Sequence, residues 1–198
     1  MQEKPKNKQS KKLVKLVVCA LMLALAFVLS LVKVWEMPFG GSVTLFSMLP
    51  ICFVAVKYGA AWGLGTAFCF SWLQIFQGQV FSWGLTSGML VASICLDYIV
   101  AFTVLGLAGI FRRKGRAGMI VGTALVCALR FAVHFISGVV LWANYEQFVA
   151  FGTSWVNHPW LYSLCYNGAF MLPETAITVV GIVLLSSVPQ VRKLIQPE

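Results

Sequence analysis

The chain has 198 residues, of which 60% are hydrophobic and 11% are charged. A water-soluble domain has about 25% charged residues, so this composition excludes an ordinary globular protein and predicts an integral membrane protein. The formal net charge of +9 does not indicate a nucleic-acid partner, because the basic residues flank apolar segments and form no groove-reading motif.

Residues 1–12 are polar and basic, and we expect them to form a disordered cytoplasmic tail. The apolar segment at about residues 13–32 predicts the first membrane helix. No small-residue cleavage pattern follows it, which indicates an anchor rather than a cleaved signal peptide. Ala20 and Ala24 lie four residues apart, a spacing that lets another helix approach closely. Packing within the chain and docking of a partner subunit would both use such a pair, and the residues alone favour packing within the chain.

Five further apolar segments predict helices at about residues 43–56, 60–76, 85–111, 117–141 and 160–188. We expect Pro50 to kink the first of these and Pro173 to interrupt the last. Together with the first segment, they predict an all-α membrane domain over residues 13–188 with six transmembrane helices. A short cytoplasmic tail, residues 189–198, follows this domain.

The basic residues predict how this domain lies in the membrane. Six spans place both termini on one face, together with Lys57 and the basic loop at residues 112–116. The loops on the opposite face contain only Lys33 among their lysines and arginines. By the positive-inside rule, both termini are therefore expected to be cytoplasmic.

The tryptophans of the predicted loops gather on the outer face, at Trp35, Trp83, Trp142, Trp155 and Trp160. An aromatic belt at the lipid headgroups is their common use, but a belt would distribute them more evenly between the two faces. We therefore expect an aromatic-lined pocket that opens outward. Such a pocket suits flat rings and cations.

The segment RFAVHFISGVVLWANY, residues 130–145, places ionisable residues inside an apolar helix. At helical spacing, Arg130, His134, Gly138 and Trp142 form one slanted stripe. A charge in hydrocarbon costs several kcal/mol unless it faces a cavity or a partner, so such residues are candidates for function. We interpret this stripe as one wall of a binding pocket.

Two other helices offer polar residues that could face this stripe. Asp97 and Tyr98 lie within the apolar run SICLDYIVAF, where Asp97 could form an ion pair with Arg130, contact a ligand, or do both. In the last helix, Ser163 and Asn167 lie on one face beside a stripe of two tyrosines, Tyr162 and Tyr166. Hydrogen bonds between helices and orientation of a ligand both remain open for these residues.

Glu174 lies deeper in the last helix, next to Pro173. It could pair with Arg130 or accept hydrogen bonds from backbone amides freed near the proline, and the residues do not decide between these roles.

The sequence contains no GxxxxGK[ST] phosphate loop, no HExxH and no GxSxG motif. We therefore expect a chain that is not an enzyme, contains no ATPase, and needs no cofactor or metal. The six cysteines lie within apolar segments without CxxC spacing, so we expect small buried side chains rather than disulfides.

Three separated segments, LDYIVAFTVLGLAG, RFAVHFISGVVLW and PWLYSLCYNGAFMLPE, carry a resemblance to a known family. In order and spacing they resemble the thiamine-specific S-component of energy-coupling factor transporters, over nearly all of residues 13–188. The resemblance implies a multi-pass, six-helix subunit of a bacterial plasma membrane that binds thiamine, with thiamine phosphates as further candidate ligands. The implied partners are a transmembrane coupling subunit and two cytoplasmic ATPases.

The resemblance also assigns residues to the site, among the last three helices and beneath the first outer loop. The implied substrate-binding residues are Trp35, Asp97, Tyr98, Arg130, His134, Trp142, Tyr162 and Asn167. Ala20 and Ala24 match the face by which this family docks on its coupling subunit, which favours docking for that pair. Asp97 stands where the family is expected to have glutamate, so its contact with ligand is expected to be longer or through water.

The chemistry of thiamine agrees with these residue types. Its thiazolium cation suits an aromatic pocket with a carboxylate, and its aminopyrimidine suits an amide and a phenol. Two alternatives remain at this point. One is an S-component for another small vitamin such as riboflavin. The other is an intramembrane hydrolase using His134 with Asp97 or Glu174, for which no nucleophile or metal motif is present.

Overall fold

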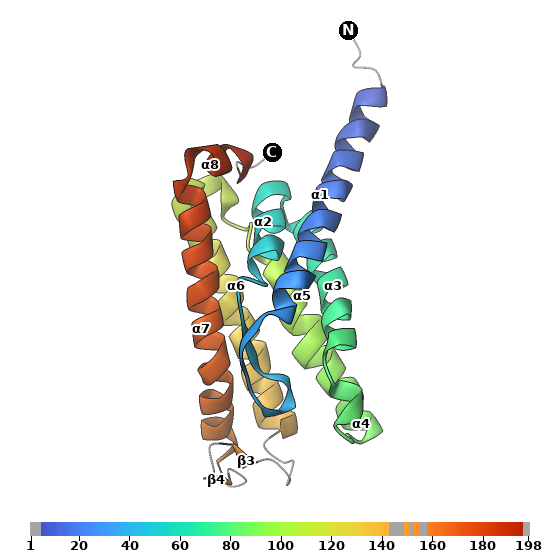
Figure 1. Cartoon of the computed structure of the whole chain (residues 1–198), viewed down its shortest axis with the longest axis vertical. Helices are drawn as coiled ribbons and strands as arrows, with labels where there is room; N and C mark the ends of the chain where they lie inside the picture. The colour runs from blue at the N-terminus through green and yellow to red at the C-terminus, as the bar shows by residue number, and fades with distance from the viewer. Residues whose placement is uncertain (1–4, 143–148, 151–152, 155–157, 196–198) are drawn as a thin grey trace.

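The computed structural model describes residues 5–142, 149–150, 153–154 and 158–195. These residues form an elongated helical bundle with a β-hairpin inside it (Figure 1). The α-helices are α1 (Pro5–Leu31), α2 (Leu49–Tyr58), α3 (Ala60–Gln77), α4 (Ser87–Ser93), α5 (Ala101–Thr103), α6 (Gly115–Ser137), α7 (Pro159–Ser187) and α8 (Pro189–Ile195). The prediction of a helical membrane protein is thus confirmed, although the strands were not predicted.

Helix α1 begins at Pro5, so part of the segment expected to be disordered is helical. Proline is tolerated in the first turn of a helix, because an N–H at that position has no intrahelical partner. Further along α1, Ala26 and Ser30 are buried where the helix packs against α2 and α3. Ala20 and Ala24 are exposed and therefore do not pack within the chain.

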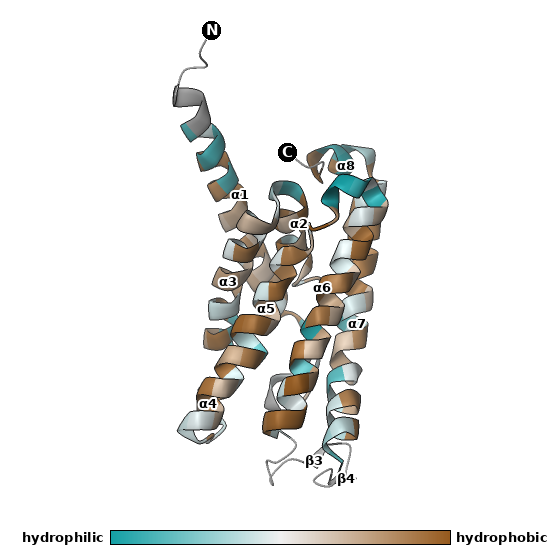
Figure 2. Ribbon diagram, turned by 180° about the vertical axis from the view of Figure 1, so that it is seen from behind, coloured by the Kyte–Doolittle hydropathy of each residue, from teal (hydrophilic) through white to brown (hydrophobic). Residues whose placement is uncertain are grey.

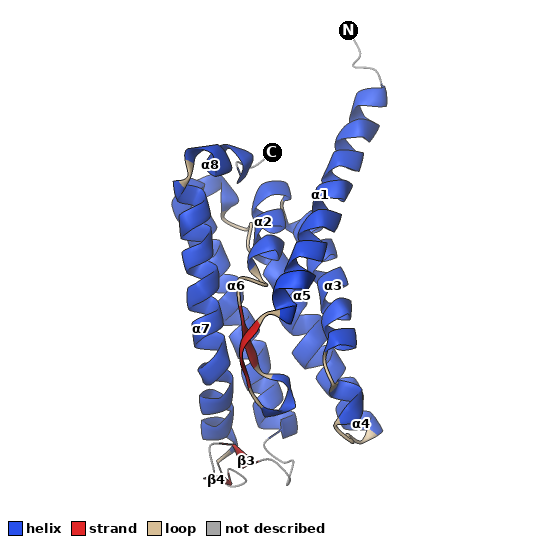
Figure 3. Cartoon of the chain, in the orientation of Figure 1, coloured by secondary structure: helices blue, strands red, loops and turns tan. Residues whose placement is uncertain are grey.

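The first outer loop contains an antiparallel hairpin of β1 (Lys33–Glu36) and β2 (Ser42–Thr44). Gly40, with φ of +94°, makes the tight turn between the strands. Gly41 lets the hairpin lie against α7, because a Cβ there would stand 2.9 Å from both Phe170 and the Tyr166 hydroxyl. Figure 3 shows the hairpin in the middle of the bundle. A second hairpin, β3 (Val149–Ala150) and β4 (Thr153–Ser154), lies in the long loop before α7.

The two prolines do not have the effects predicted from the sequence. Pro50 lies in the first turn of α2, so it begins that helix rather than kinking it. The segment before it, expected to be helical from residue 43, instead holds β2. Pro173 lies inside α7, which continues as one helix of 29 residues. The proline removes one backbone hydrogen bond without ending the helix.

Two of the predicted membrane helices are not α-helical throughout, because each contains a π-helical stretch. The segment predicted as one α-helix over 85–111 comprises α4, a π-helical stretch (Ile94–Val100), α5 and a 3₁₀ turn (Val104–Leu107). Helix α6 likewise passes into a π-helical stretch, Gly138–Trp142. A π-helix adds a residue to the turn and often occurs at functional sites.

Close packing of small residues holds these segments together. Gly63 on α3 and Gly106 face each other, and a Cβ on Gly63 would lie 2.4 Å from the Gly106 carbonyl oxygen. Small residues at such crossings are typical of membrane helices, because lipid provides little hydrophobic drive for helix association. The packed side chains include Phe70, Leu105 and Val126, which are fully buried.

Within the described residues, four helical segments are long and apolar enough to cross a membrane: Gln9–Leu31, Ser87–Leu107, Arg112–Trp142 and Pro159–Ser187. Helix α2 has ten residues, or about 15 Å, which is about half of a hydrocarbon core of about 30 Å. Six membrane spans therefore remain a prediction. Figure 2 shows hydrophilic residues gathered in the start of α1 and in α8, which lie at the same end of the bundle.

The six cysteines, all in the described part of the chain, are free. Burial was predicted for all of them and is confirmed for Cys19, Cys52 and Cys127. Cys69 and Cys95 are exposed on the outside of the bundle, so that part of the prediction is wrong. An apolar segment that faces lipid on one side does not bury every side chain within the protein.

Candidate functional site

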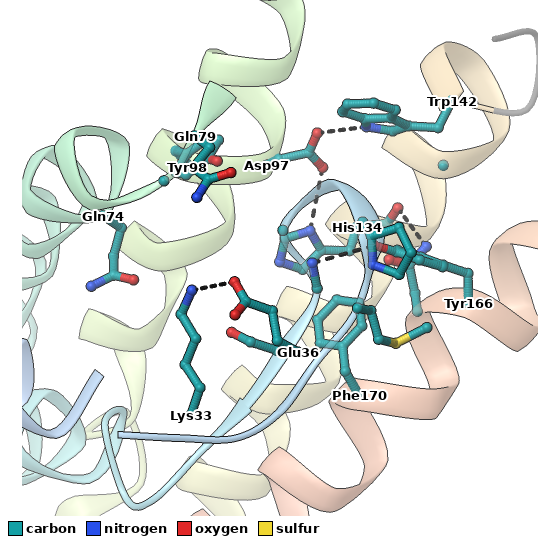
Figure 4. A pocket seen from close by; sticks show the side chains of 18 of the residues that line it. Lys33, Glu36, Gln74, Gln79, Asp97, Tyr98, His134, Trp142, Tyr166 and Phe170 are labelled. Atoms are coloured by element: carbon teal, nitrogen blue, oxygen red, sulfur yellow. Dashed lines mark hydrogen bonds and ion pairs between the residues drawn. The ribbon is translucent and has the colours of Figure 1, made fainter. Parts of the chain in front are cut away.

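A cavity of about 430 Å³ lies between the β1–β2 hairpin, the ends of α1 and α3, the two π-helical stretches and α7 (Figure 4). It occupies the part of the bundle away from α8, since it is lined by Ser30 near the end of α1 and by Tyr162 near the start of α7. Among the eight substrate-binding residues expected from the sequence, seven line it: Asp97, Tyr98, Arg130, His134, Trp142, Tyr162 and Asn167.

Asp97 is the centre of a hydrogen-bond cluster in the cavity wall. Its Oδ2 accepts from Trp142 Nε1 at 2.9 Å and from Ser93 Oγ at 3.0 Å, while its Oδ1 lies 3.3 Å from His134 Nδ1. Figure 4 shows the carboxylate between the indole and the imidazole. The ion pair with Arg130, one of the alternatives left open for Asp97, is not among its described contacts, which are with these three residues. Asp97 and Trp142 each lie in a π-helical stretch.

Arg130 lies beneath this cluster and is 7% exposed. Its guanidinium carbon lies 4.1 Å from the centre of the Phe102 ring, a cation–π contact, and its Nη1 donates to the sulfur of Met48 at 2.7 Å. Its Nε has no hydrogen-bond partner within the described residues. A buried cation with unused donors beside a cavity is suited to a ligand that brings an acceptor.

Gly138 allows α6 and α7 to meet closely at the cavity. A Cβ on Gly138 would lie 2.3 Å from Ser163 Oγ and 2.9 Å from Asn167 Nδ2. In this contact Asn167 Nδ2 donates to the backbone oxygen of His134 at 3.1 Å and to Ser163. Every hydrogen bond described for Asn167 uses its amide nitrogen, so the carbonyl oxygen is the group left for a ligand. The helix-packing role and the ligand role considered for this residue are therefore compatible.

Aromatic rings form much of the remaining wall. Trp83 and Trp142 meet edge to face with their centroids 5.5 Å apart, and Tyr162 stacks on Tyr166 at 5.7 Å. His134 meets the Phe170 ring edge to face at 5.7 Å. The predicted aromatic pocket is therefore present, although only part of the predicted tryptophans contribute.

Two of the predicted outer-face tryptophans, Trp35 and Trp160, do not line the cavity. Trp35 is 47% exposed and is not among the lining residues, so the expectation that it covers the site is not met here. Trp160 is 65% exposed and suits the headgroup belt weighed as the alternative. Trp155 lies outside the described residues.

Two long-range contacts hold the hairpin over the cavity. The Tyr166 hydroxyl donates to the Pro38 carbonyl and accepts from the Gly41 N–H. Glu174 Oε1 accepts from the backbone N–H of Thr44 at 2.5 Å and from its hydroxyl at 2.6 Å. Glu174 thus binds the hairpin, and its described hydrogen bonds include neither Arg130 nor the amides near Pro173, the two partners left open by the sequence.

The cavity also contains residues that the sequence reasoning did not assign to the site. Lys33 and Glu36 enter it from β1, and Gln74 and Gln77 from the end of α3. A signal for Glu36 was available, because a single carboxylate in a short outer loop is uncommon beside so much apolar sequence. No local signal could have placed the α3 glutamines opposite Asp97.

Comparisons with known proteins agree with this geometry. The family model described as thiamine transporter protein matches residues 16–193. The thiamine transporter ThiT of Bacillus subtilis (strain 168) is 34% identical over 191 residues, covering 89% of this chain and 92% of that protein. The thiamine transporter ThiT of Lacticaseibacillus paracasei is 29% identical over 164 residues, covering 73% and 74%.

A solved structure of ThiT from Listeria monocytogenes has the same fold, with a TM-score of 0.72 and 22% identity. The likeness covers 95% of this chain and 100% of that one. The length of the family match and the identity to the Bacillus protein lead to one conclusion: this chain belongs to the thiamine transporter protein family and is a multi-pass membrane protein of bacteria.

Proposed function

We propose that this chain is the thiamine-binding S-component of an energy-coupling factor transporter. The observation that carries the proposal is the cavity itself, which brings Asp97, Trp142 and Asn167 together within one polypeptide. Its volume of about 430 Å³ falls within the range of about 300–1,000 Å³ that is common for small-molecule sites. The relatives named thiamine transporters support the choice of ligand.

The seven expected residues that line the cavity, together with Trp83, divide among the parts of thiamine. The Asp97 carboxylate and the edge-to-face pair of Trp83 and Trp142 offer charge and ring faces to the thiazolium cation. Tyr162 and the oxygen of Asn167 offer polar groups to the aminopyrimidine. Arg130 and His134 offer donors to the hydroxyethyl tail or to a phosphate on it, and Tyr98 adds a hydroxyl to the same cavity. Trp35 is left out of this assignment.

We further propose six membrane spans with both termini in the cytoplasm. The common end of α1 and α8, where the hydrophilic residues gather, supports this orientation. The cavity then opens toward the outside, as an uptake protein requires. Residues 1–12 and 189–198 form the cytoplasmic tails, although α1 and α8 extend into them.

Uptake against a gradient requires energy, and the sequence contains no phosphate loop. We propose that a transmembrane coupling subunit and two cytoplasmic ATPases supply it. Ala20 and Ala24 are exposed in the C-terminal half of α1, and small exposed residues allow another helix to approach closely. These two residues are the proposed docking face.

The test is a thiamine titration of the purified chain alone in detergent, followed by tryptophan fluorescence and calorimetry. We expect saturable quenching and heat, because Trp83 and Trp142 line the cavity. Riboflavin serves as the comparison ligand and should produce neither signal. Binding of riboflavin without thiamine would identify a subunit for another vitamin, and the absence of both would overturn the proposed function.

A further inference from the structure

Lys33 and Glu36 form an ion pair on β1, with Lys33 Nζ 2.5 Å from Glu36 Oε1. Residues three apart in a regular strand point to opposite faces of a sheet. Here the pairing runs Lys33 to Thr44 and then Trp35 to Val43, so β1 contains one more residue than β2 at that point. Because of this β-bulge, the side chains of Lys33 and Glu36 point to the same face of the hairpin.

Both members of the pair line the cavity. Figure 4 shows the Lys33 ammonium and the Glu36 carboxylate meeting among the side chains that surround it, between the α3 glutamine Gln74 and His134. The side chains are 33% and 56% exposed, so the pair is reachable from the mouth of the cavity. The bulge thus places a carboxylate and a cation on a flexible stem together in the exposed part of the cavity wall.

The two carboxylates of the cavity, Asp97 and Glu36, differ in the partners that bind them. Asp97 is held by Ser93, Trp142 and His134, each through a side chain of a packed helix. Glu36 has Lys33 as its described partner, and a lysine head can leave by rotating its stem. A ligand cation can therefore replace the ammonium on Glu36 without leaving the carboxylate unpaired, whereas a neutral ligand cannot.

We propose that Lys33 competes with the cationic ligand for Glu36, the second carboxylate of the cavity beside Asp97, and that it limits the preference of the cavity for charged over neutral rings. This inference rests on the proposed function, because it assumes a ligand with a thiazolium cation. Lys33 lowers the affinity for the cation, since its ammonium must be displaced. In return, the pair keeps the entrance electrically neutral when no cation is bound there.

The experiment compares thiamine with a neutral isostere in which carbon replaces the thiazolium nitrogen. Lys33→Met removes the charge and keeps the stem, and we expect it to bind thiamine about two- to fivefold more tightly, as is usual for release of a partly exposed ion pair. Binding of the neutral isostere should not change. Lys33→Arg is the matched control, and it should leave thiamine affinity within twofold of the wild type.

Glu36→Gln completes a double-mutant cycle, which isolates the coupling between the two residues. With Glu36→Gln present, Lys33→Met should have no further effect on thiamine binding. An equal change for both ligands, or a persisting effect of Lys33→Met beside Glu36→Gln, would overturn the inference, as would weaker thiamine binding by Lys33→Met. Failure of the wild-type chain to bind thiamine would instead contradict the proposed function. A Lys33→Gln variant repeats the test with a polar side chain.

Discussion

Trp142 donates its indole N–H to the Asp97 carboxylate at 2.9 Å, and this bond joins the two π-helical stretches of the chain. The bond crosses 45 residues of sequence and orients the indole in the cavity wall. A hydrogen bond to a charged group is worth more than one between neutral groups, about 1.5–3 kcal/mol. Trp142 therefore contributes both a ring face and a fixed position for the carboxylate.

Replacing Trp142 with Ala should weaken thiamine binding more than replacing Trp62. We expect a loss of about 0.5–2 kcal/mol, or roughly two- to thirtyfold in Kd, from the missing cation–π contact alone. Trp62 packs against Cys19, Val54 and Tyr58 away from the cavity, so it is the matched control. Calorimetric titration measures both variants. Trp142→Phe keeps a ring and loses the N–H, and should fall between them. Equal effects of Trp142→Ala and Trp62→Ala would show that Trp142 does not form a wall of the thiamine site.

Gly138→Ala should weaken thiamine binding and lower the melting temperature. The added Cβ would lie 2.3 Å from Ser163 Oγ, so α6 and α7 must separate at the cavity. Overpacking of this kind costs about 1–3 kcal/mol. Gly168→Ala on α7 is the control, because a Cβ there meets no atom within 4 Å. Thermal unfolding in detergent and thiamine titration provide the two readouts. If Gly138→Ala behaved like Gly168→Ala in both measurements, the close contact between α6 and α7 at Gly138 would not be needed for binding or stability.

Glu174→Ala should free the β1–β2 hairpin. The backbone N–H of Thr44 would lose its acceptor, at a cost of about 1–3 kcal/mol for a buried group left unpaired, while its hydroxyl would keep Ser47 Oγ at 2.6 Å as a partner. Limited proteolysis should cut the hairpin faster in this variant, and thiamine should protect it less. Thr44→Val, which keeps the backbone N–H bond, should have a smaller effect. Unchanged cleavage of Glu174→Ala would mean that Tyr166 alone holds the hairpin.

Replacing both Ala20 and Ala24 with Trp should separate binding from transport. The two positions are exposed and are not among the residues that line the cavity, so thiamine titration of the isolated chain should be unchanged. The bulk should block close approach of a coupling subunit and abolish ATP-driven uptake into vesicles by the complete transporter. Ala26→Trp, at a fully buried position of the same helix, should instead damage the fold and binding. Intact uptake by the double variant would place the docking surface elsewhere.

Helical spacing was enough to predict one wall of the site. Arg130, His134, Gly138 and Trp142 were assigned to a single stripe, and all four line the cavity. The assignment held despite the change to π-helical winding at Gly138, because neighbours on a helix surface are decided by local geometry. The last membrane helix was also placed closely, at 160–188 against Pro159–Ser187.

Helical spacing could not predict which residues form hydrogen bonds with the buried carboxylates. Asp97 bonds to His134 and Trp142 rather than to Arg130, because periodicity within one helix does not decide at which level a side chain of another helix meets it. Glu174 binds Thr44, which lies 130 residues earlier. Neither contact leaves a local pattern in the sequence.

By itself, the sequence determined the membrane class, most of the helices and the residue types of the cavity, because apolar length and helical periodicity are local properties. The tertiary structure decided what the first outer loop does. There, the bulge turned Lys33 and Glu36 into the cavity, while Trp35 stayed exposed. A shift of one residue in a strand reverses the face of every side chain, and only packing of the hairpin against α7 selects the register.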